Sequence, residues 1–326
     1  MNEESGLASE VSQTLTLTLS PMEEFSMKVF VTGASGFIGS AVVRELIESG
    51  HQVVGLARSD KSAASVASEG AEVLRGDLDD LDSLRSGAAA SDGVIHTAFI
   101  HDFTDFAKAA EADRCAIETI GAVLAGSDRP FVVSAGTPGL MAGRVVTEDE
   151  TFDAPLPRFS EDAALLLTSQ GVRVSVLRLP RSVHGEGDHG FVPQLINIAR
   201  SKGVAGYPGD GSYRWPAVHR LDAARLFRLA LENAPAGTRL HAVGDEGIPV
   251  RDIAGVIGRH LNLPVASVPL SEVDAHFGFL GRIFSYDCPS SSALTQERFG
   301  WHPEQPGLLA DLDQGHYFKN EMVVSG

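Results

Sequence analysis

The stretch Val29-Phe30-Val31-Thr32-Gly33-Ala34-Ser35-Gly36-Phe37-Ile38-Gly39 sets the expectation for the fold. An apolar run ends at Gly33, glycines follow in the pattern GxxGxxG, and apolar residues then recur at helical spacing. In a strand–turn–helix unit of this kind, the first glycine permits a tight turn and the second lets backbone N–H groups approach a pyrophosphate. The third glycine lets the helix pack closely on the sheet. Because the helix N-terminus also carries a partial positive charge, the pattern predicts a dinucleotide-binding turn.

The rest of the chain extends this unit. Short apolar runs alternate with helical segments over residues 28–179, which implies right-handed βαβ units and a parallel sheet. After Pro180 the rhythm changes, and glycines and histidines cluster at Gly185–Gly190. We therefore expect an α/β fold, a Rossmann-type doubly wound parallel sheet with a smaller C-terminal substrate lobe. We expect three parts: a disordered or loosely attached tail (1–26), the dinucleotide-binding Rossmann domain (27–180), and residues 181–326, which mainly form the substrate lobe.

Composition narrows the class of partner. The 326 residues carry a formal net charge of −17, so we expect neither nucleic acid nor membrane as a partner. No apolar run is long enough to span a bilayer, and the tail lacks the features of a signal peptide. The two cysteines, Cys115 and Cys288, stand far apart and fit reduced thiols in a cytoplasmic protein. The expected partner is a small-molecule substrate, and homodimer formation stays open.

The residues at the end of the second strand indicate whether the cofactor is NAD or NADP. An acidic residue there usually accepts hydrogen bonds from the ribose hydroxyls of NAD. This chain instead reads Gly55-Leu56-Ala57-Arg58-Ser59, in which Arg58 follows the strand directly. Because a guanidinium can grip a 2′-phosphate and stack on adenine, we predict NADP (NADPH) as the cofactor. The alternative is that Arg58 is a solvated surface residue and that Asp60 contacts the ribose.

Four segments carry a family resemblance. Thr32–Gly39, Gly76-Asp77-Leu78, His96-Thr97-Ala98 and Arg178-Leu179-Pro180 together resemble the extended and atypical short-chain dehydrogenase/reductases. The similarity covers roughly residues 28–310 and implies an epimerase, dehydratase or carbonyl reductase. It also implies that a segment near 218–245 returns to the Rossmann domain. With the glycine turn and the second-strand end, the expected cofactor-binding residues are Gly33, Ser35, Gly36, Phe37, Ile38, Gly39, Arg58, Ser59, Asp77, Leu78, Thr97, Ala98, Phe99, Pro180 and Val183.

The catalytic residues of this family are only partly present. The family's working acid is a Tyr with a Lys four residues on, and none of the four tyrosines here has a Lys at that spacing. The two positions fall near Leu156 and Ser160. By the same resemblance, Ser134 and Thr137 lie beside the nicotinamide and Asp113 takes the place of the family's Asn. The alternatives are that Ser134 and Thr137 only form a turn, and that Asp113 is a plain charge on the helix surface.

A carbonyl reduction also needs a proton donor. His184 and His189 follow the strand expected beside the nicotinamide, and imidazole titrates near neutrality, so either is a candidate donor. A loop histidine that only bonds the backbone is the alternative. Their spacing does not match a zinc site, so we expect no metal. His101, Tyr213 and Trp215 are candidates for the substrate pocket, although the last two also fit a core.

These observations lead to one expected function and its rivals. We expect an NADP(H)-dependent oxidoreductase that acts on a carbonyl/alcohol pair of a small metabolite. Aromatic residues after Pro180 point to an apolar or aromatic substrate, unless they are core: Phe191, Trp215, Phe277, Phe279 and Phe284. The rivals are an epimerase or dehydratase of the same superfamily, and an NADP(H)-binding sensor or repurposed non-redox protein without the Tyr–Lys pair.

Overall fold

The structure is a computed structural model that describes residues 26–100, 105–138, 143–151 and 159–319. The tail expected over residues 1–26 therefore lies, except for Ser26, outside the described residues, and so does His101. Within the described ranges, no helix combines the length and the apolar character needed to cross a membrane.

The centre of the molecule is a seven-stranded sheet in which every neighbouring pair is parallel. Its strands are β1 (Lys28–Thr32), β2 (Gln52–Ala57), β3 (Glu72–Arg75), β4 (Gly93–His96), β5 (Pro130–Gly136), β6 (Arg173–Leu179) and β10 (Thr238–His241). Their order is β10-β6-β5-β4-β1-β2-β3. The strands are short apolar runs with buried residues on both faces, as an all-parallel sheet covered by helices requires.

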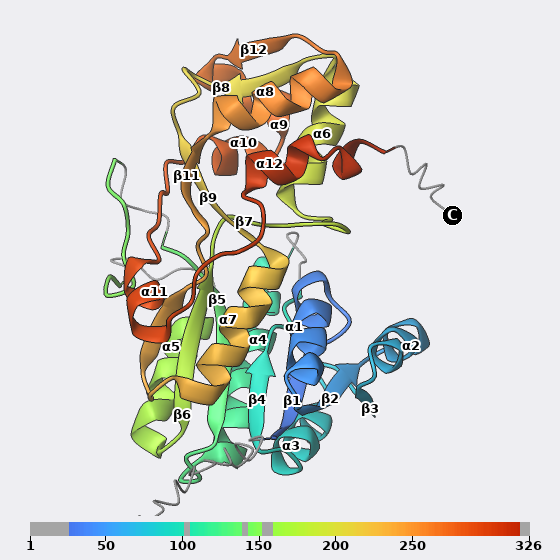
Figure 1. The fold of residues 1–326 in the computed structure, drawn as a ribbon, viewed down its shortest axis with the longest axis vertical. Coiled ribbons are helices and arrows are strands. Elements are labelled where there is room, and N and C mark those ends of the chain that lie inside the picture. The colour runs from blue at the N-terminus through green and yellow to red at the C-terminus, as the bar shows by residue number, and fades with distance from the viewer. Residues whose placement is uncertain (1–25, 101–104, 139–142, 152–158, 320–326) are drawn as a thin grey trace, which may run out of the picture.

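Helices cover both faces of this sheet (Figure 1). They are α1 (Phe37–Glu48), α2 (Asp60–Ser68), α3 (Leu81–Ala89), α4 (Phe106–Leu124), α5 (Ser160–Leu166), the 3₁₀ turn η1 (Leu167–Gln170) and α7 (Arg220–Asn233). Apolar residues of α1 and α7 share one core cluster, whereas those of α3, α4 and α5 share the other. This arrangement confirms the predicted Rossmann-type doubly wound fold.

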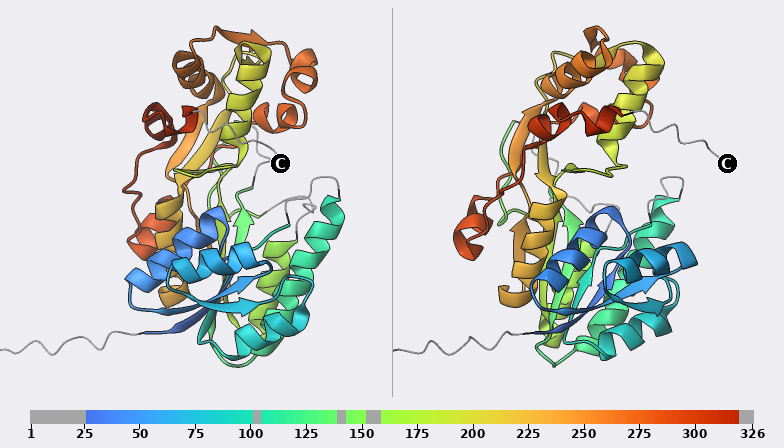
Figure 2. Two further views of the ribbon diagram at one scale, coloured as in Figure 1. Left: turned by 90° about the vertical axis from the view of Figure 1, so that its right-hand side faces the viewer. Right: turned by 45° about the vertical axis from the view of Figure 1, so that its right-hand side comes forward.

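Most of the remaining elements form a lobe over the edge at which α1 and α7 begin, whereas the helix Ala293–Phe299 lies beside α7 and β10 (Figure 1; Figure 2). The strands of the lobe are β7 (Ser182–His184), β8 (Ala205–Pro208), β9 (Arg214–His219), β11 (Asp245–Pro249) and β12 (Val265–Val268). They form one sheet of order β11-β9-β7 and one β12-β8 pair. The helical elements of this part of the chain are α6 (Phe191–Lys202), α8 (Val250–Leu261), η2 (Leu270–Glu272), α9 (Val273–Phe277), α10 (Leu280–Phe284), α11 (Ala293–Phe299), α12 (Leu308–Asp313) and η3 (His316–Phe318). The domain boundaries expected at 26 and 180 stay predictions.

A buried charged cluster ties β6 to its neighbours. Arg178 is fully buried, and its guanidinium donates to both carboxylate oxygens of Glu161 at 2.7 and 2.6 Å. Arg239 donates to the same carboxylate at 2.7 Å. His241 lies 3.1 Å from Arg178 Nη1, and burial together with that positive charge lowers the pKa of His241 to about 4. The imidazole therefore stays neutral and can accept a hydrogen bond from the guanidinium.

This cluster yields a stability prediction. Glu161→Gln removes the carboxylate that the buried guanidinium of Arg178 shares with Arg239, so we expect the free energy of unfolding to fall by about 3 kcal/mol. The matched control is Glu69→Gln, which breaks a surface pair with Arg44 and costs less than about 1 kcal/mol. Urea denaturation followed by circular dichroism measures both. Equal losses in the two variants would contradict this account.

Candidate cofactor and active site

The glycine turn is packed too tightly for side chains. Gly33 has a φ of +71°, and a Cβ at this residue would lie 2.7 Å from the backbone nitrogen of Ala98. The Gly36 N–H donates to the Gly33 carbonyl at 2.9 Å and closes the turn. At Gly39 an added Cβ would lie 1.9 Å from the same carbonyl oxygen. Glycine at these positions thus lets β1, the turn and α1 meet at close range.

The N-terminus of α1 is open to a ligand. Gly36 is its N-cap and provides no side chain to accept from the first-turn N–H groups, which begin with Phe37 and Ile38. No acidic residue stands in that first turn. Ser35 and Gly36 are exposed. The partial positive charge of the helix end is thus left for an external anion.

The end of β4 closes one side of the turn. The Thr97 hydroxyl donates to the Thr32 carbonyl at 2.8 Å, and the Ala98 N–H lies 3.4 Å from the Thr32 hydroxyl. The Phe99 ring packs at 5.8 Å from that of Phe106. These contacts hold the three residues after β4 beside Gly33, which is where the family resemblance places the cofactor ribose.

On the side where the adenine is expected, Asp77 stabilises its own turn and Arg58 is an unpaired cation. Asp77 accepts from the backbone of its own turn, and Leu78 is buried in the core. Arg58 is exposed after β2, and the described structure gives its side chain no hydrogen bond or ion pair. Asp60 instead pairs with Arg75 at 3.0 Å, and Ser59 caps α2. The guanidinium of Arg58 is therefore free to receive an anion.

A buried chain of polar side chains runs behind the turn. The Thr32 hydroxyl lies 2.8 Å from His96 Nδ1, and His96 Nε2 lies 3.1 Å from Asp113 Oδ1. Ser160 donates to the second oxygen of Asp113. All four side chains are at most 1% exposed. The alternative that Asp113 is a surface charge is therefore wrong, because the inner face of α4 carries it into the interior.

Comparison with known proteins places this geometry in a family. A model of the "NAD dependent epimerase/dehydratase family" matches residues 29–123. The chain is 52% identical over 295 residues to an uncharacterized protein of Schizosaccharomyces pombe, covering 90% of this chain and all of that protein. It is 30% identical over 273 residues to a 2-alkyl-3-oxoalkanoate reductase of Stenotrophomonas maltophilia, covering 78% of this chain and 79% of that one.

The chain belongs to the NAD-dependent epimerase/dehydratase family. This finding confirms the predicted membership of the extended short-chain dehydrogenase/reductases. A crystal structure of a dTDP-glucose 4,6-dehydratase of Streptomyces venezuelae has the same fold. The TM-score is 0.73 at 20% identity, over 90% of this chain and 98% of that one.

The positions that the resemblance implies for catalysis carry other side chains, and Leu156, at the expected Tyr position, lies outside the described residues. Ser160 is the first residue of α5 and lies near the position expected for the Lys. Its hydroxyl donates a hydrogen bond to the carboxylate of Asp113. Ser134 is buried near the end of β5. The Thr137 N–H donates to the Leu179 carbonyl at 2.8 Å, which places Thr137 beside Pro180. In the described structure the Thr137 hydroxyl has no hydrogen-bond partner, and so it is available to a ligand.

The two candidate proton donors lie in different environments. His184 is fully buried on β7, and its Nδ1 lies 2.8 Å from Asp311 Oδ2. Despite its burial, Asp311 has a pKa held below the usual value by hydrogen bonds from His184 and His316. His189 is exposed, and its ring lies edge-on to Phe37 at 5.8 Å. Val183, next to His184, packs on the main-sheet core. Burial makes His184 unsuited to exchange protons directly with a substrate.

The aromatic candidates for the substrate pocket belong to the core of the lobe. Trp215 is fully buried, packs 5.1 Å from Phe284 and donates to the Ile283 carbonyl at 3.3 Å. Tyr213 is half-buried against the same cluster, which also contains Phe277. The idea that these rings line a substrate pocket is therefore wrong for Trp215. The argument for an aromatic substrate loses the support of Trp215, Phe277 and Phe284, which are buried in this core.

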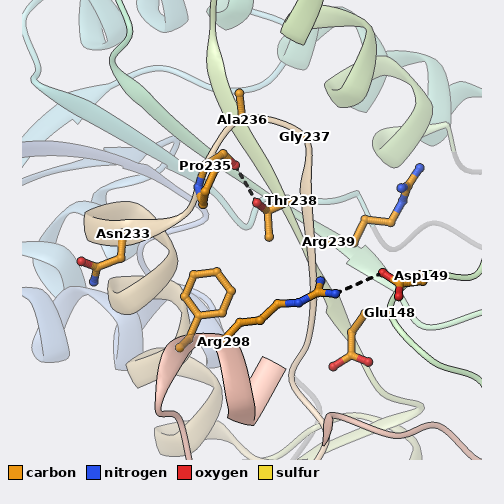
Figure 3. A pocket seen from close by; sticks show the side chains of 10 residues that line it. Glu148, Asp149, Asn233, Pro235, Ala236, Gly237, Thr238, Arg239 and Arg298 are labelled. Atoms are coloured by element: carbon orange, nitrogen blue, oxygen red, sulfur yellow. Dashed lines mark hydrogen bonds and ion pairs between the residues drawn. The ribbon is translucent and has the colours of Figure 1, made fainter. Parts of the chain in front are cut away.

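One cavity of the described structure lies away from this site. Its volume is about 780 Å³, and it is lined by Glu148, Asp149, Asn233, Pro235, Ala236, Gly237, Thr238, Arg239, Arg298 and Phe299 (Figure 3). It adjoins the start of β10, and three strands (β6, β5 and β4) separate β10 from β1 in the sheet. Arg298 and Asp149 form an ion pair at 3.6 Å within it. Across the described ranges, no group of three or more His, Cys, Asp or Glu side chains is arranged to hold a metal ion.

The close approach at the turn gives a direct test. Gly39→Ala forces a methyl group against the Gly33 carbonyl, so we expect the free energy of unfolding to fall by about 2–3 kcal/mol. Gly255→Ala, within α8, is the control because an added Cβ there meets nothing within 4 Å. It should raise stability by about 0.5–1 kcal/mol. A Gly39→Ala protein as stable in urea as the wild type would show that the turn is not tightly packed.

Proposed function

We propose that this protein is an NADP(H)-dependent oxidoreductase that interconverts a carbonyl and an alcohol on a small metabolite. The observation that carries the proposal is the open N-terminus of α1 behind the glycine turn, with the unpaired Arg58 one strand away. The similarity to a 2-alkyl-3-oxoalkanoate reductase supports carbonyl reduction. An epimerase or dehydratase is the second candidate, because the family model covers such enzymes.

The residues around the turn fit a nicotinamide dinucleotide. The first-turn N–H groups of Phe37 and Ile38 would receive the pyrophosphate, and Arg58 would receive the 2′-phosphate. Residues 97–99 would flank the ribose, and Pro180 would lie by the nicotinamide. When bound, the reduced cofactor supplies a hydride to the carbonyl carbon.

The protein must then hold the substrate oxygen and deliver a proton to it. Thr137 lies beside Pro180, and its hydroxyl can donate a hydrogen bond to a carbonyl oxygen; Ser134, buried near the end of β5, is the second candidate. The family's Tyr–Lys pair is absent and His184 is buried, so we assign the proton to the exposed His189 or to a water molecule that enters with the substrate. The buried chain from Thr32 to Ser160 acts at a distance, because it fixes the end of β1 and the start of α5 relative to the middle of α4.

The choice between NADP and NAD is tested at Arg58. Arg58→Gln removes the charge expected on the 2′-phosphate, so the Kd of NADPH should rise by about tenfold or more while that of NADH changes little. Arg85→Gln is the control, because Arg85 is an exposed arginine paired with Asp82 on α3. Isothermal titration calorimetry measures all the constants. Equal losses for NADPH and NADH would remove the cofactor assignment.

The role of Thr137 is tested by turnover. With a panel of aldehydes, ketones and diketones, NADPH oxidation is followed by its absorbance. Thr137→Val should lower kcat by about 10- to 100-fold without changing the Kd of NADPH, and Thr137→Ser should retain most of the activity. Tight NADPH binding by the wild type with no oxidation across the panel would favour the non-redox sensor instead.

A further inference from the structure

Arg220 is a half-buried arginine without a partner. In the described part of the chain its guanidinium makes no hydrogen bond or ion pair, and its Nε is buried without an acceptor. The other two arginines of α7 do have carboxylate partners: Arg225 bonds Glu304, and Arg228 bonds Glu45 and Glu232. In a protein of net charge −17, a partly buried cation without a carboxylate is unlike its neighbours.

The position of Arg220 is electrostatically unfavourable without a ligand. It is the first residue of α7, where the helix dipole disfavours a positive charge. The acid in that first turn is Asp222, but it is buried and its two oxygens accept from the backbone N–H groups of Glu304 and Gln305 at 2.9 and 3.0 Å. No acid of the described structure therefore offsets the charge of Arg220 by direct contact.

Its guanidinium lies over the side chain of the first residue of α1, directly after the glycine turn. Arg220 Cζ lies 5.1 Å from the centroid of the Phe37 ring, and Phe37 is the first residue of α1. Gly185 packs on the stem of Arg220, because an added Cβ at Gly185 would lie 3.3 Å from Arg220 Cγ. Helices α1 and α7 lie side by side, and both begin at the edge of the sheet that faces the lobe (Figure 1; Figure 2). Two helix N-termini and one guanidinium thus converge at this point.

We propose that Arg220 binds the pyrophosphate of the dinucleotide from the side opposite the N–H groups of Phe37 and Ile38. The planar guanidinium can donate two parallel hydrogen bonds to phosphate oxygens, and the Phe37 ring holds its plane. The anion supplies the negative charge that Arg220 lacks, because both oxygens of Asp222 accept from backbone N–H groups. This inference rests on the proposed function, since it assigns a second clamp to the same cofactor.

Calorimetry with NADPH and NADH separates this role from that of Arg58. Because both nucleotides contain the pyrophosphate, Arg220→Gln should raise both Kd values by the same factor, about tenfold or more. Arg225→Gln, on the same helix, should leave both within about twofold. Adenosine 2′-monophosphate lacks the pyrophosphate, so its affinity, measured by competition, should be unchanged by Arg220→Gln and reduced by Arg58→Gln.

A second variant keeps the test independent of folding. Arg220→Lys retains the charge but not the two-pronged geometry, so its affinity for both nucleotides should lie between those of the wild type and Arg220→Gln. Nucleotide binding by the wild type that neither variant changes would overturn the assignment of Arg220 alone. A wild-type protein that binds neither nucleotide would overturn the proposed function and this inference with it.

Discussion

The contact between Gly39 and the carbonyl of Gly33 is the constraint on which the site depends. With 1.9 Å between an added Cβ and that oxygen, the first turn of α1 can lie on the turn only if residue 39 has no side chain. This closeness directs the N-terminus of α1 toward the edge of the sheet over which the lobe stands (Figure 2). The positive end of α1 thereby becomes part of the candidate cofactor site. Two guanidinium groups without a carboxylate partner stand near it: Arg58, which follows β2, and Arg220, which begins α7.

Behind the glycine turn lies the buried chain of polar side chains, in a protein that lacks the family's usual Tyr–Lys pair. A family member of the usual kind uses a Tyr–Lys pair, whereas here the carboxylate of Asp113 is held between His96 and Ser160. Each donor and acceptor in that chain is satisfied, which is what burial of a carboxylate requires. The chain can therefore fix the geometry of the site, but it presents no acid to a substrate.

The parts of the fold predicted from sequence are those determined by local spacing. The βαβ alternation and the glycine turn depend on residues within one unit, and the structure contains them. The partners of Asp113 lie 17 and 47 residues away, so no local pattern indicates them. Trp215 stands in the six-residue strand β9, and the short strands of the lobe lack a clear alternation. Its burial depends on helices distant in sequence, which is why a core residue resembled a pocket residue. The lack of a partner for Arg220 likewise emerges only in three dimensions.

A crystal structure of the protein with NADPH bound tests the central claim most directly. The account predicts that the pyrophosphate lies on the N–H groups of Phe37 and Ile38, with the 2′-phosphate against Arg58 and the nicotinamide beside Pro180 and Thr137. A nucleotide bound elsewhere, for example in the cavity beside β10, or crystals grown with NADPH at saturating concentration that contain none, would contradict it.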